Sequence, residues 1–248
     1  MQPAAARLRT VDPTDAGAPF VVLADRTDGG PMRIVVVASG ALAPGDEAWL
    51  DGADAVIAAD GGAASLDRLG RRPDRLVGDL DSAPRPLVER LEAAGTRVDR
   101  HPEDKDASDT ELALRAAIED GAGRVDLLGA IGGDRLDHEL ANLLLLVDPD
   151  FAGIELRAIS GSTVVRAVRG GRRLSLQGDV GDLVTLLPIG GDAKGVTAVG
   201  LRWPLDGATL PMGRSRGLSN VVVGPDASIT LTDGILLVVE TASTGDHS

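Results

Sequence analysis

The sequence predicts an α/β protein: an N-terminal three-layer α/β domain with a mostly parallel sheet, then a C-terminal antiparallel β-sandwich. In the first half, continuous apolar runs, typical of strands buried on both faces, alternate with helical segments. After about Gly161, short β-branched runs follow one another, separated by Gly, Pro and Asp. We expect a loose extension over residues 1–32, the α/β domain over 33–155 and the β-sandwich over 160–242.

Each element of the first half is predicted from its own residue pattern. Apolar runs such as RIVVVA and AVIAA indicate strands, and amphipathic stretches that end at glycine indicate helices. The expected strands cover 33–38, 55–59, 75–77, 96–99, 124–128 and 155–159. The expected helices cover 63–69, 84–94, 110–119 and 137–147.

The second half contains strand patterns without intervening helices. Its β-branched runs are short and are bounded by turn-forming residues, as in a sandwich. The expected strands cover 163–168, 183–187, 195–199, 220–223, 228–232 and 235–240.

The composition excludes several classes of function. The formal net charge is -13, and aromatic residues make up only 2% of the chain, so a nucleic-acid-binding protein is not expected. The absence of cysteine excludes thiolate nucleophiles, disulfides and Cys-zinc sites. No apolar run is long enough to span a membrane, and no signal-peptide pattern opens the chain. We therefore expect a cytoplasmic protein with no membrane partner.

The loop ADGGA (59–63) places Asp60 and Gly61 between a strand and a helix. Glycine lets the backbone approach a ligand closely, and the helix N-terminus offers free N–H groups to an anion. Both residues are therefore candidates for binding a nucleotide. The alternative is a tight strand-to-helix turn that Asp60 caps.

The loop VGDLDS (77–82) carries Asp79 and Asp81, two positions apart. In an extended loop, side chains at this spacing project to the same side. Two converging carboxylates favour a hard cation such as Mg²⁺, and both residues are candidates for metal binding and catalysis. The alternative is a solvated Asx-type turn.

The segment PEDKDASDTELAL (102–114) combines an acidic cluster with a helix start. Ser108 and Glu111 fit a capping box, and Asp109 is favoured by the helix dipole. Capping does not account for Asp106, which we predict to be a metal ligand together with Asp79, Asp81 and Asp109. Lys105 either contacts a phosphate or neutralises its acidic neighbours.

The segment GAIGGDRLDHELANLLLL (129–146) begins with glycines after a strand and continues into a helix. Arg135 is a candidate for gripping a phosphate, and Asp137 for capping the helix. His138 is either a site residue or a structural histidine, and the spacing of the histidines does not fit zinc.

These loops share one position, because each follows a strand whose carboxyl end meets the same edge of a parallel sheet. A divalent cation between carboxylates and phosphates also removes the conflict between an acidic protein and an anionic substrate. Metal-assisted phosphoryl chemistry is the best single account of them.

Taken in order, these motifs resemble the thiamine diphosphokinase (thiamine pyrophosphokinase) family. The similar stretches are ADGGA, VGDLDS, DKDASDTELAL, GAIGGDRLDHELANL, GDLVTLLPI, GVTAVGLRWPL and GLSN, within residues 33–240. The resemblance implies transfer of a diphosphate from Mg-ATP to the hydroxyl of thiamine, with release of AMP. It also implies a homodimer whose active sites lie at the subunit interface.

The resemblance also implies roles for single residues. Asp60 joins the aspartates that handle magnesium and phosphates, and Lys105 and Ser108 lie near thiamine or the transferred group. Arg135, Asp137 and His138 line the nucleotide side. Ser219 and Asn220 reach thiamine from the partner subunit.

Other functions stay open at this point. A diphosphokinase for another alcohol, such as a hydroxymethylpterin, would share the N-terminal motifs. A non-catalytic nucleotide- or thiamine-binding regulator would bind ligand without releasing AMP. A structural module would use its aspartates only for caps and turns.

Overall fold

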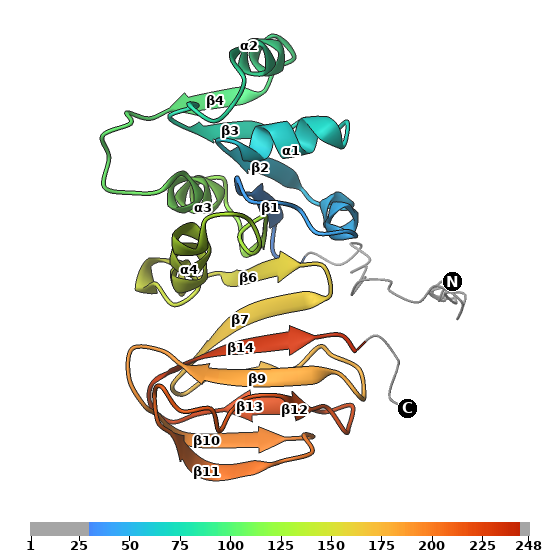
Figure 1. The fold of residues 1–248 in the computed structure, drawn as a ribbon, viewed down its shortest axis with the longest axis vertical. Coiled ribbons are helices and arrows are strands. Elements are labelled where there is room, and N and C mark those ends of the chain that lie inside the picture. Colours follow the sequence, from blue (N-terminus) through green and yellow to red (C-terminus); the bar gives the residue numbers. More distant parts are fainter. Residues whose placement is uncertain (1–29, 244–248) are drawn as a thin grey trace, which may run out of the picture.

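The computed structural model describes residues 30–243, so most of the expected N-terminal extension lies outside the described residues. The first half forms a parallel sheet in the spatial order β6-β5-β1-β2-β3-β4 (Figure 1). The strands are β1 Arg33–Val37, β2 Ala55–Ala59, β3 Arg75–Gly78, β4 Arg97–Arg100, β5 Arg124–Leu128 and β6 Glu155–Ser160. The predicted alternation of strands and helices is confirmed.

Helices cover both faces of this sheet and give the predicted three layers. The 3-10 helix η1 and helices α1 and α2 pack on one face, and α3 and α4 pack on the other. Strand β1 contributes to the hydrophobic core on both faces of the sheet. Val35 and Val37 pack on the side of η1, α1 and α2, and Ile34 and Val36 pack on the side of α3 and α4. All four side chains are fully buried. The bounds are η1 Asp46–Leu50, α1 Gly62–Arg68, α2 Arg85–Ala93, α3 Asp109–Glu119, α4 Leu136–Leu145 and η2 Pro149–Phe151.

The parallel sheet continues directly into the second half of the chain. Strand β6 pairs in parallel with β5 and antiparallel with β7, and β14, β9 and β12 extend the same sheet to ten strands. These strands are β7 Thr163–Arg169, β9 Leu183–Pro188, β12 Asn220–Val221 and β14 Ile235–Thr241. We propose that β6, which pairs with β5 on one side and β7 on the other, joins the α/β domain to the β-sandwich.

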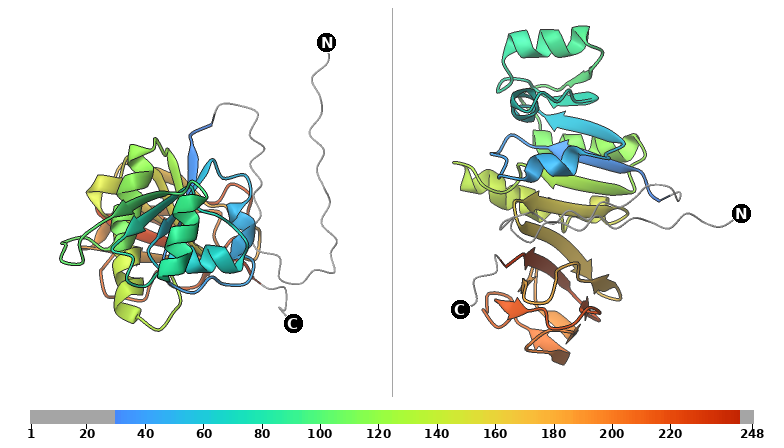
Figure 2. Two further views of the ribbon diagram at one scale, coloured as in Figure 1. Left: turned by 90° about the horizontal axis from the view of Figure 1, so that it is seen from above. Right: turned by 90° about the vertical axis from the view of Figure 1, so that its right-hand side faces the viewer.

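A separate four-stranded antiparallel sheet, in the order β11-β10-β13-β8, completes the sandwich (Figure 2, right). Alternate residues of β9 and β10, including Val184, Leu186 and Val196, enter the core between the two sheets. The strands are β8 Arg173–Ser175, β10 Ala193–Val199, β11 Leu205–Leu210 and β13 Ser228–Thr230.

A buried charge cluster lies near the amino ends of the central strands. Asp126 of β5 accepts hydrogen bonds from Arg33 Nε and Arg157 Nε, each at 2.7 Å, and both Asp126 and Arg157 are fully buried. The Arg157 guanidinium also lies 5.0 Å from the centroid of the Trp49 ring. This cluster ties β1, β5 and β6 together below the sheet edge that carries the predicted site.

In the part of the chain that the structure describes, no helix is long and apolar enough to cross a membrane.

Candidate functional site

Asp60, Asp79 and Asp109 converge at the carboxyl edge of the parallel sheet. Asp60 follows β2 and Asp79 follows β3, and these strands are neighbours in the sheet. Asp109 is the first residue of α3, which packs against both strands. One carboxylate oxygen of each residue lies within 4.8 Å of those of the other two. Carboxylate oxygens at this spacing suit a hard divalent cation such as Mg²⁺.

The backbone around the cluster adopts unusual conformations. Gly78 has a φ of 150°, and a Cβ there would lie 3.0 Å from Asp109 Oδ1 and 3.0 Å from Asp60 Cβ. Only glycine therefore lets the carboxylates approach this closely. Asp60 and Leu80 have positive φ angles of 42° and 64°, a region that side chains disfavour and that is enriched at functional sites.

Asp60 carries the clearest sign of a cation site. Its side chain is buried, and its Oδ1 atom has no hydrogen-bond partner among residues 30–243. Burial raises the pKa of Asp60 above its ordinary value, and the nearby charges of Asp109 and Asp81 act in the same direction. Since an unpaired buried carboxylate oxygen is costly, this atom fits a position that a bound cation would satisfy.

The raised pKa makes a prediction about stability. The folded state holds the Asp60 proton more tightly than the unfolded chain does. Stability is therefore lost as the pH rises from the unfolded-state pKa through the higher folded-state pKa. We expect Asp60→Asn to raise the melting temperature in magnesium-free buffer at neutral pH, and this gain to vanish below the unfolded-state pKa. Calorimetry at both pH values checks this, and a lower melting temperature at neutral pH would refute it.

Lys105 closes the cluster on one side. Its Nζ atom lies 2.6 Å from Asp79 Oδ2 and 2.8 Å from Asp109 Oδ1. The hydrogen bond from Lys105 lowers the pKa of Asp79. Burial lowers the pKa of Lys105, but its bonds to both aspartates outweigh burial and leave that pKa raised. Asp79 and Lys105 therefore both carry their charges at neutral pH.

Other predicted metal ligands lie outside this group. Asp81 is exposed; its backbone N–H donates to Asp79 Oδ1 at 3.2 Å, and its Oδ1 accepts from the Ser82 hydroxyl at 2.9 Å. Asp106 is also exposed. The predicted Asx-type turn therefore exists here, while the metal roles of Asp81 and Asp106 stay predictions. Ser108 is the N-cap of α3 and accepts from Glu111 N–H at 3.2 Å, as the capping-box pattern predicts.

The glycine-rich loop after β5 lies beside β1 at the same sheet edge. Gly40 N–H donates to Gly129 O at 3.0 Å, and a Cβ on Gly40 would lie 2.3 Å from that oxygen. Arg135 and Asp137 are exposed and form a two-pronged ion pair at 2.9 and 2.6 Å. This pair lowers the pKa of Asp137. Asp137 lies within α4, whose N-cap residue is Arg135, so the prediction that Asp137 caps this helix is wrong.

His138, Ser219 and Asn220 do not belong to the converging carboxylate group. His138 is exposed on the first turn of α4. Ser219 is exposed with a φ of 55°, and its N–H donates to Thr185 Oγ1 at 3.0 Å. The buried Asn220 amide instead binds the backbone of Trp203, accepting at 3.0 Å and donating at 2.7 Å. Their predicted binding roles stay predictions.

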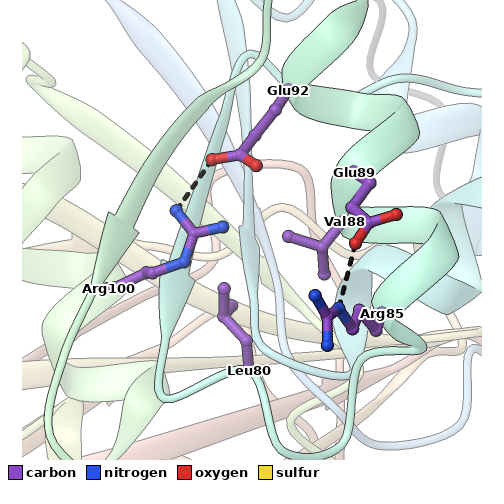
Figure 3. Close-up of a pocket in the computed structure, with 6 residues that line it drawn as sticks. All are labelled: Leu80, Arg85, Val88, Glu89, Glu92 and Arg100. Atoms are coloured by element: carbon purple, nitrogen blue, oxygen red, sulfur yellow. Dashed lines mark hydrogen bonds and ion pairs between the residues drawn. The ribbon is translucent and has the colours of Figure 1, made fainter.

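A surface groove that the sequence did not predict opens beside Leu80. Leu80 is the residue between Asp79 and Asp81 in the VGDLDS loop. Figure 3 shows Leu80 and Val88 between two ion pairs. Arg85 bonds Glu89 at 2.9 Å, and Arg100 bonds Glu92 at 2.7 Å. Each ion pair therefore balances its own charges at the groove.

From its local residue pattern Asp60 was predicted to bind the nucleotide, and only the family resemblance grouped it with the aspartates that handle magnesium. The sequence does contain a signal that Asp60 and Asp79 lie together. Asp60 comes soon after the strand 55–59, as Asp79 comes soon after the strand 75–77. Knowing that these strands pair would have grouped the two carboxylates.

Two family models match the chain. Residues 47–158 match the thiamin pyrophosphokinase catalytic domain, and residues 173–236 match the thiamin pyrophosphokinase vitamin B1 binding domain. Both matches fall within the range over which the motifs resemble this family.

Individual proteins are similar over most of the chain. A thiamine pyrophosphokinase of Bacillus subtilis is 26% identical over 183 residues, covering 74% of this chain and 85% of the relative. Thiamine pyrophosphokinase 3 of rice is 27% identical over 206 residues, covering 73% and 76%. The crystal structure of the Bacillus subtilis enzyme has a TM-score of 0.75 at 25% identity, covering 85% of this chain and 99% of that one. That from Geobacillus thermodenitrificans has a TM-score of 0.72 at 29% identity, covering 86% and 99%.

Proposed function

Because the chain belongs to the thiamine pyrophosphokinase family, we propose that it transfers a diphosphate from Mg-ATP to thiamine at the Asp60–Asp79–Asp109 cluster. The thiamine hydroxyl oxygen bonds to the β-phosphorus of ATP, and the bond from that phosphorus to the oxygen bridging it to the α-phosphorus breaks. The products are thiamine diphosphate and AMP, and the hydroxyl proton passes to a base. The observation that carries the proposal is the convergence of these carboxylates at the sheet edge.

Magnesium is the cofactor that fits these side chains. The ligand atoms are all carboxylate oxygens, and the orphaned Oδ1 of buried Asp60 supports a cation at this position. We expect Asp60, Asp79 and Asp109 to hold the ion. When bound, magnesium offsets the negative charge of the phosphates.

The remaining tasks belong to the protein's own groups. An aspartate of the cluster or its loop is expected to accept the hydroxyl proton. The loop after β5, which leads to Arg135, lies at the same carboxyl edge of the sheet, with β1 between β5 and β2. Open α/β sheets bind ligands at this edge, so we expect Arg135 and this loop to hold the nucleotide. Arg135 must first exchange its bond to Asp137 for one to phosphate.

The substrate assignment can be tested separately from the chemistry. The protein is incubated with ATP, magnesium and either thiamine or a hydroxymethylpterin, and AMP and the diphosphate ester are quantified by chromatography. We expect equal amounts of AMP and thiamine diphosphate with thiamine alone. AMP formed only with the pterin would overturn the substrate, and binding of ATP and thiamine without AMP would favour a non-catalytic regulator.

We also expect a homodimer, with Ser219 of each subunit facing the active site of the other. Helix α4 exposes an apolar stripe: Leu136, Leu140 and Leu144 are 66%, 53% and 52% exposed and recur every four residues on one helix face. A stripe of this kind marks an interaction surface. The stripe begins at Leu136, between the predicted nucleotide-side residues Arg135 and Asp137, so a subunit packed there would lie near the site.

The stripe gives a prediction for the assembly. Replacing Leu140 with aspartate should convert the dimer into a monomer and lower turnover, because a charge in an apolar interface is poorly solvated. Light scattering after gel filtration measures the mass. Leu69→Asp, at a leucine that is 39% exposed and forms the C-cap of α1, is the control and should leave the dimer intact. A Leu140→Asp dimer of unchanged stability would place the interface elsewhere.

A further inference from the structure

Lys105 occupies a particular position within the carboxylate cluster. Its ammonium group bridges Asp79 Oδ2 and Asp109 Oδ1 at 2.6 and 2.8 Å, and only 14% of its side chain is exposed. The one other lysine of the chain, Lys194, forms an exposed pair with Asp233 at 3.2 Å on the β-sandwich. The two lysines therefore form ion pairs in very different surroundings.

The charge balance of the cluster depends on Lys105. Asp60, Asp79 and Asp109 bring carboxylate oxygens within 4.8 Å of one another in a partly buried setting. Like charges at this distance repel strongly where water is scarce. The Lys105 ammonium is the only cationic group that pairs with these carboxylates among residues 30–243.

The ammonium and a metal ion would compete for the same carboxylate groups. Asp79 Oδ1 accepts the Asp81 N–H at 3.2 Å, whereas Oδ2 accepts from Lys105 at 2.6 Å. Asp109 also uses one oxygen, Oδ1, for Lys105. A cation on these carboxylates would repel the nearby ammonium, so metal binding favours displacement of the ammonium.

The local chain allows such a displacement. Lys105 lies in the irregular segment between β4 and α3, outside both elements, and Asp109 follows it at the helix start. A lysine reaches its partners through four methylene groups, so its charge can move by several ångströms without a change in the helix.

We propose that Lys105 is a built-in counter-ion, which holds the carboxylates together until magnesium replaces it and which then turns to the phosphates that accompany the metal. This inference rests on the proposed function, since it concerns the same metal site. It makes Lys105 a positioning residue whose ammonium and Mg²⁺ exclude each other.

The test measures magnesium binding by calorimetry without nucleotide, and thermal unfolding in a chelating buffer. Lys105→Gln removes the competing charge, so we expect roughly tenfold tighter Mg²⁺ binding, as suits the loss of one close charge interaction. The same variant should melt at a lower temperature without metal, and added magnesium should restore it. Lys105→Arg keeps the charge and should stay close to the natural protein in both measurements. Lys194→Gln is the matched control and should change neither.

The outcomes separate this inference from the proposed function. If Lys105→Gln binds Mg²⁺ with unchanged or weaker affinity while the natural protein binds the ion and makes thiamine diphosphate, the counter-ion role is wrong and the function stands. If the natural protein makes no thiamine diphosphate but the variant still binds Mg²⁺ more tightly, the exchange is supported and the proposed reaction fails. A metal-free melting temperature of Lys105→Gln equal to that of Lys194→Gln would also overturn the counter-ion role.

Discussion

Replacing Asp79 with asparagine is expected to lower turnover by about two to three orders of magnitude, the size typical for loss of one key electrostatic contact to the transition state. Asp79 belongs to the converging carboxylate group and pairs with Lys105 at 2.6 Å. Asparagine keeps the shape of the side chain and an oxygen that can accept the Asp81 N–H, but it removes the charge that favours a divalent cation.

The fold should survive this change. Steady-state kinetics measures the loss of turnover, and circular dichroism and thermal unfolding confirm the structure. Asp67→Asn, at an exposed ion pair with Arg90, is a suitable control and should keep normal activity. Near-normal turnover of Asp79→Asn would remove the cluster from the mechanism.

Asp81→Asn extends the same experiment. The sequence pattern gives Asp81 the same metal role as Asp79, whereas the structure leaves Asp81 exposed and outside the carboxylate group. A loss comparable to that of Asp79→Asn would add Asp81 to the working site. Near-normal turnover would limit the metal ligands to the converging group.

The largest effect on stability is expected at Asp126. Replacing it with alanine leaves Arg157, which is fully buried, without its counter-charge, and also removes the partner of Arg33. Breaking a buried ion pair from one side costs about 3–5 kcal/mol of unfolding free energy. Urea denaturation at neutral pH measures this free energy.

Two further variants serve as comparisons for the loss of unfolding free energy in Asp126→Ala. Asp126→Asn keeps the volume and an acceptor oxygen, so it should lose less stability and remain measurable if the alanine variant does not fold. Asp67→Ala removes an exposed carboxylate 2.5 Å from Arg90 and should cost less than about 1 kcal/mol. Equal losses at Asp67 and Asp126 would show that the buried cluster contributes nothing special.

Much of the fold could be predicted from the sequence because its strands are strongly patterned. The runs 55–59 and 124–128 match β2 and β5 residue for residue. The first is continuously apolar, as a strand buried on both faces should be, whereas β5 also carries Arg124 and the buried Asp126. The short strands β8 and β11 were not predicted. Both lie in the smaller sheet and are largely exposed, so they lack the hydrophobic pattern that marks a strand.

The sequence predicted the type of site, a carboxylate cluster at the sheet edge, but not every residue that contributes to it. Local sequence identifies which loops carry carboxylates, and Asp79 and Asp109 do converge as expected. The place of Asp60 depends on the pairing of β2 with β3, and the bridging position of Lys105 depends on how its segment folds back to β3. Such long-range contacts leave no local signal. The exposure of Asp81 likewise follows from the positive φ of Leu80, which turns the loop.

The most direct test of the central claim follows the β-phosphorus of ATP through the reaction. The protein is supplied with magnesium, thiamine and ATP labelled at that atom, and the products are separated. Transfer of a whole diphosphate predicts that all transferred label is in thiamine diphosphate, with one unlabelled AMP for each product. Labelled ADP together with unlabelled thiamine monophosphate would show transfer of a single phosphate and would contradict the account.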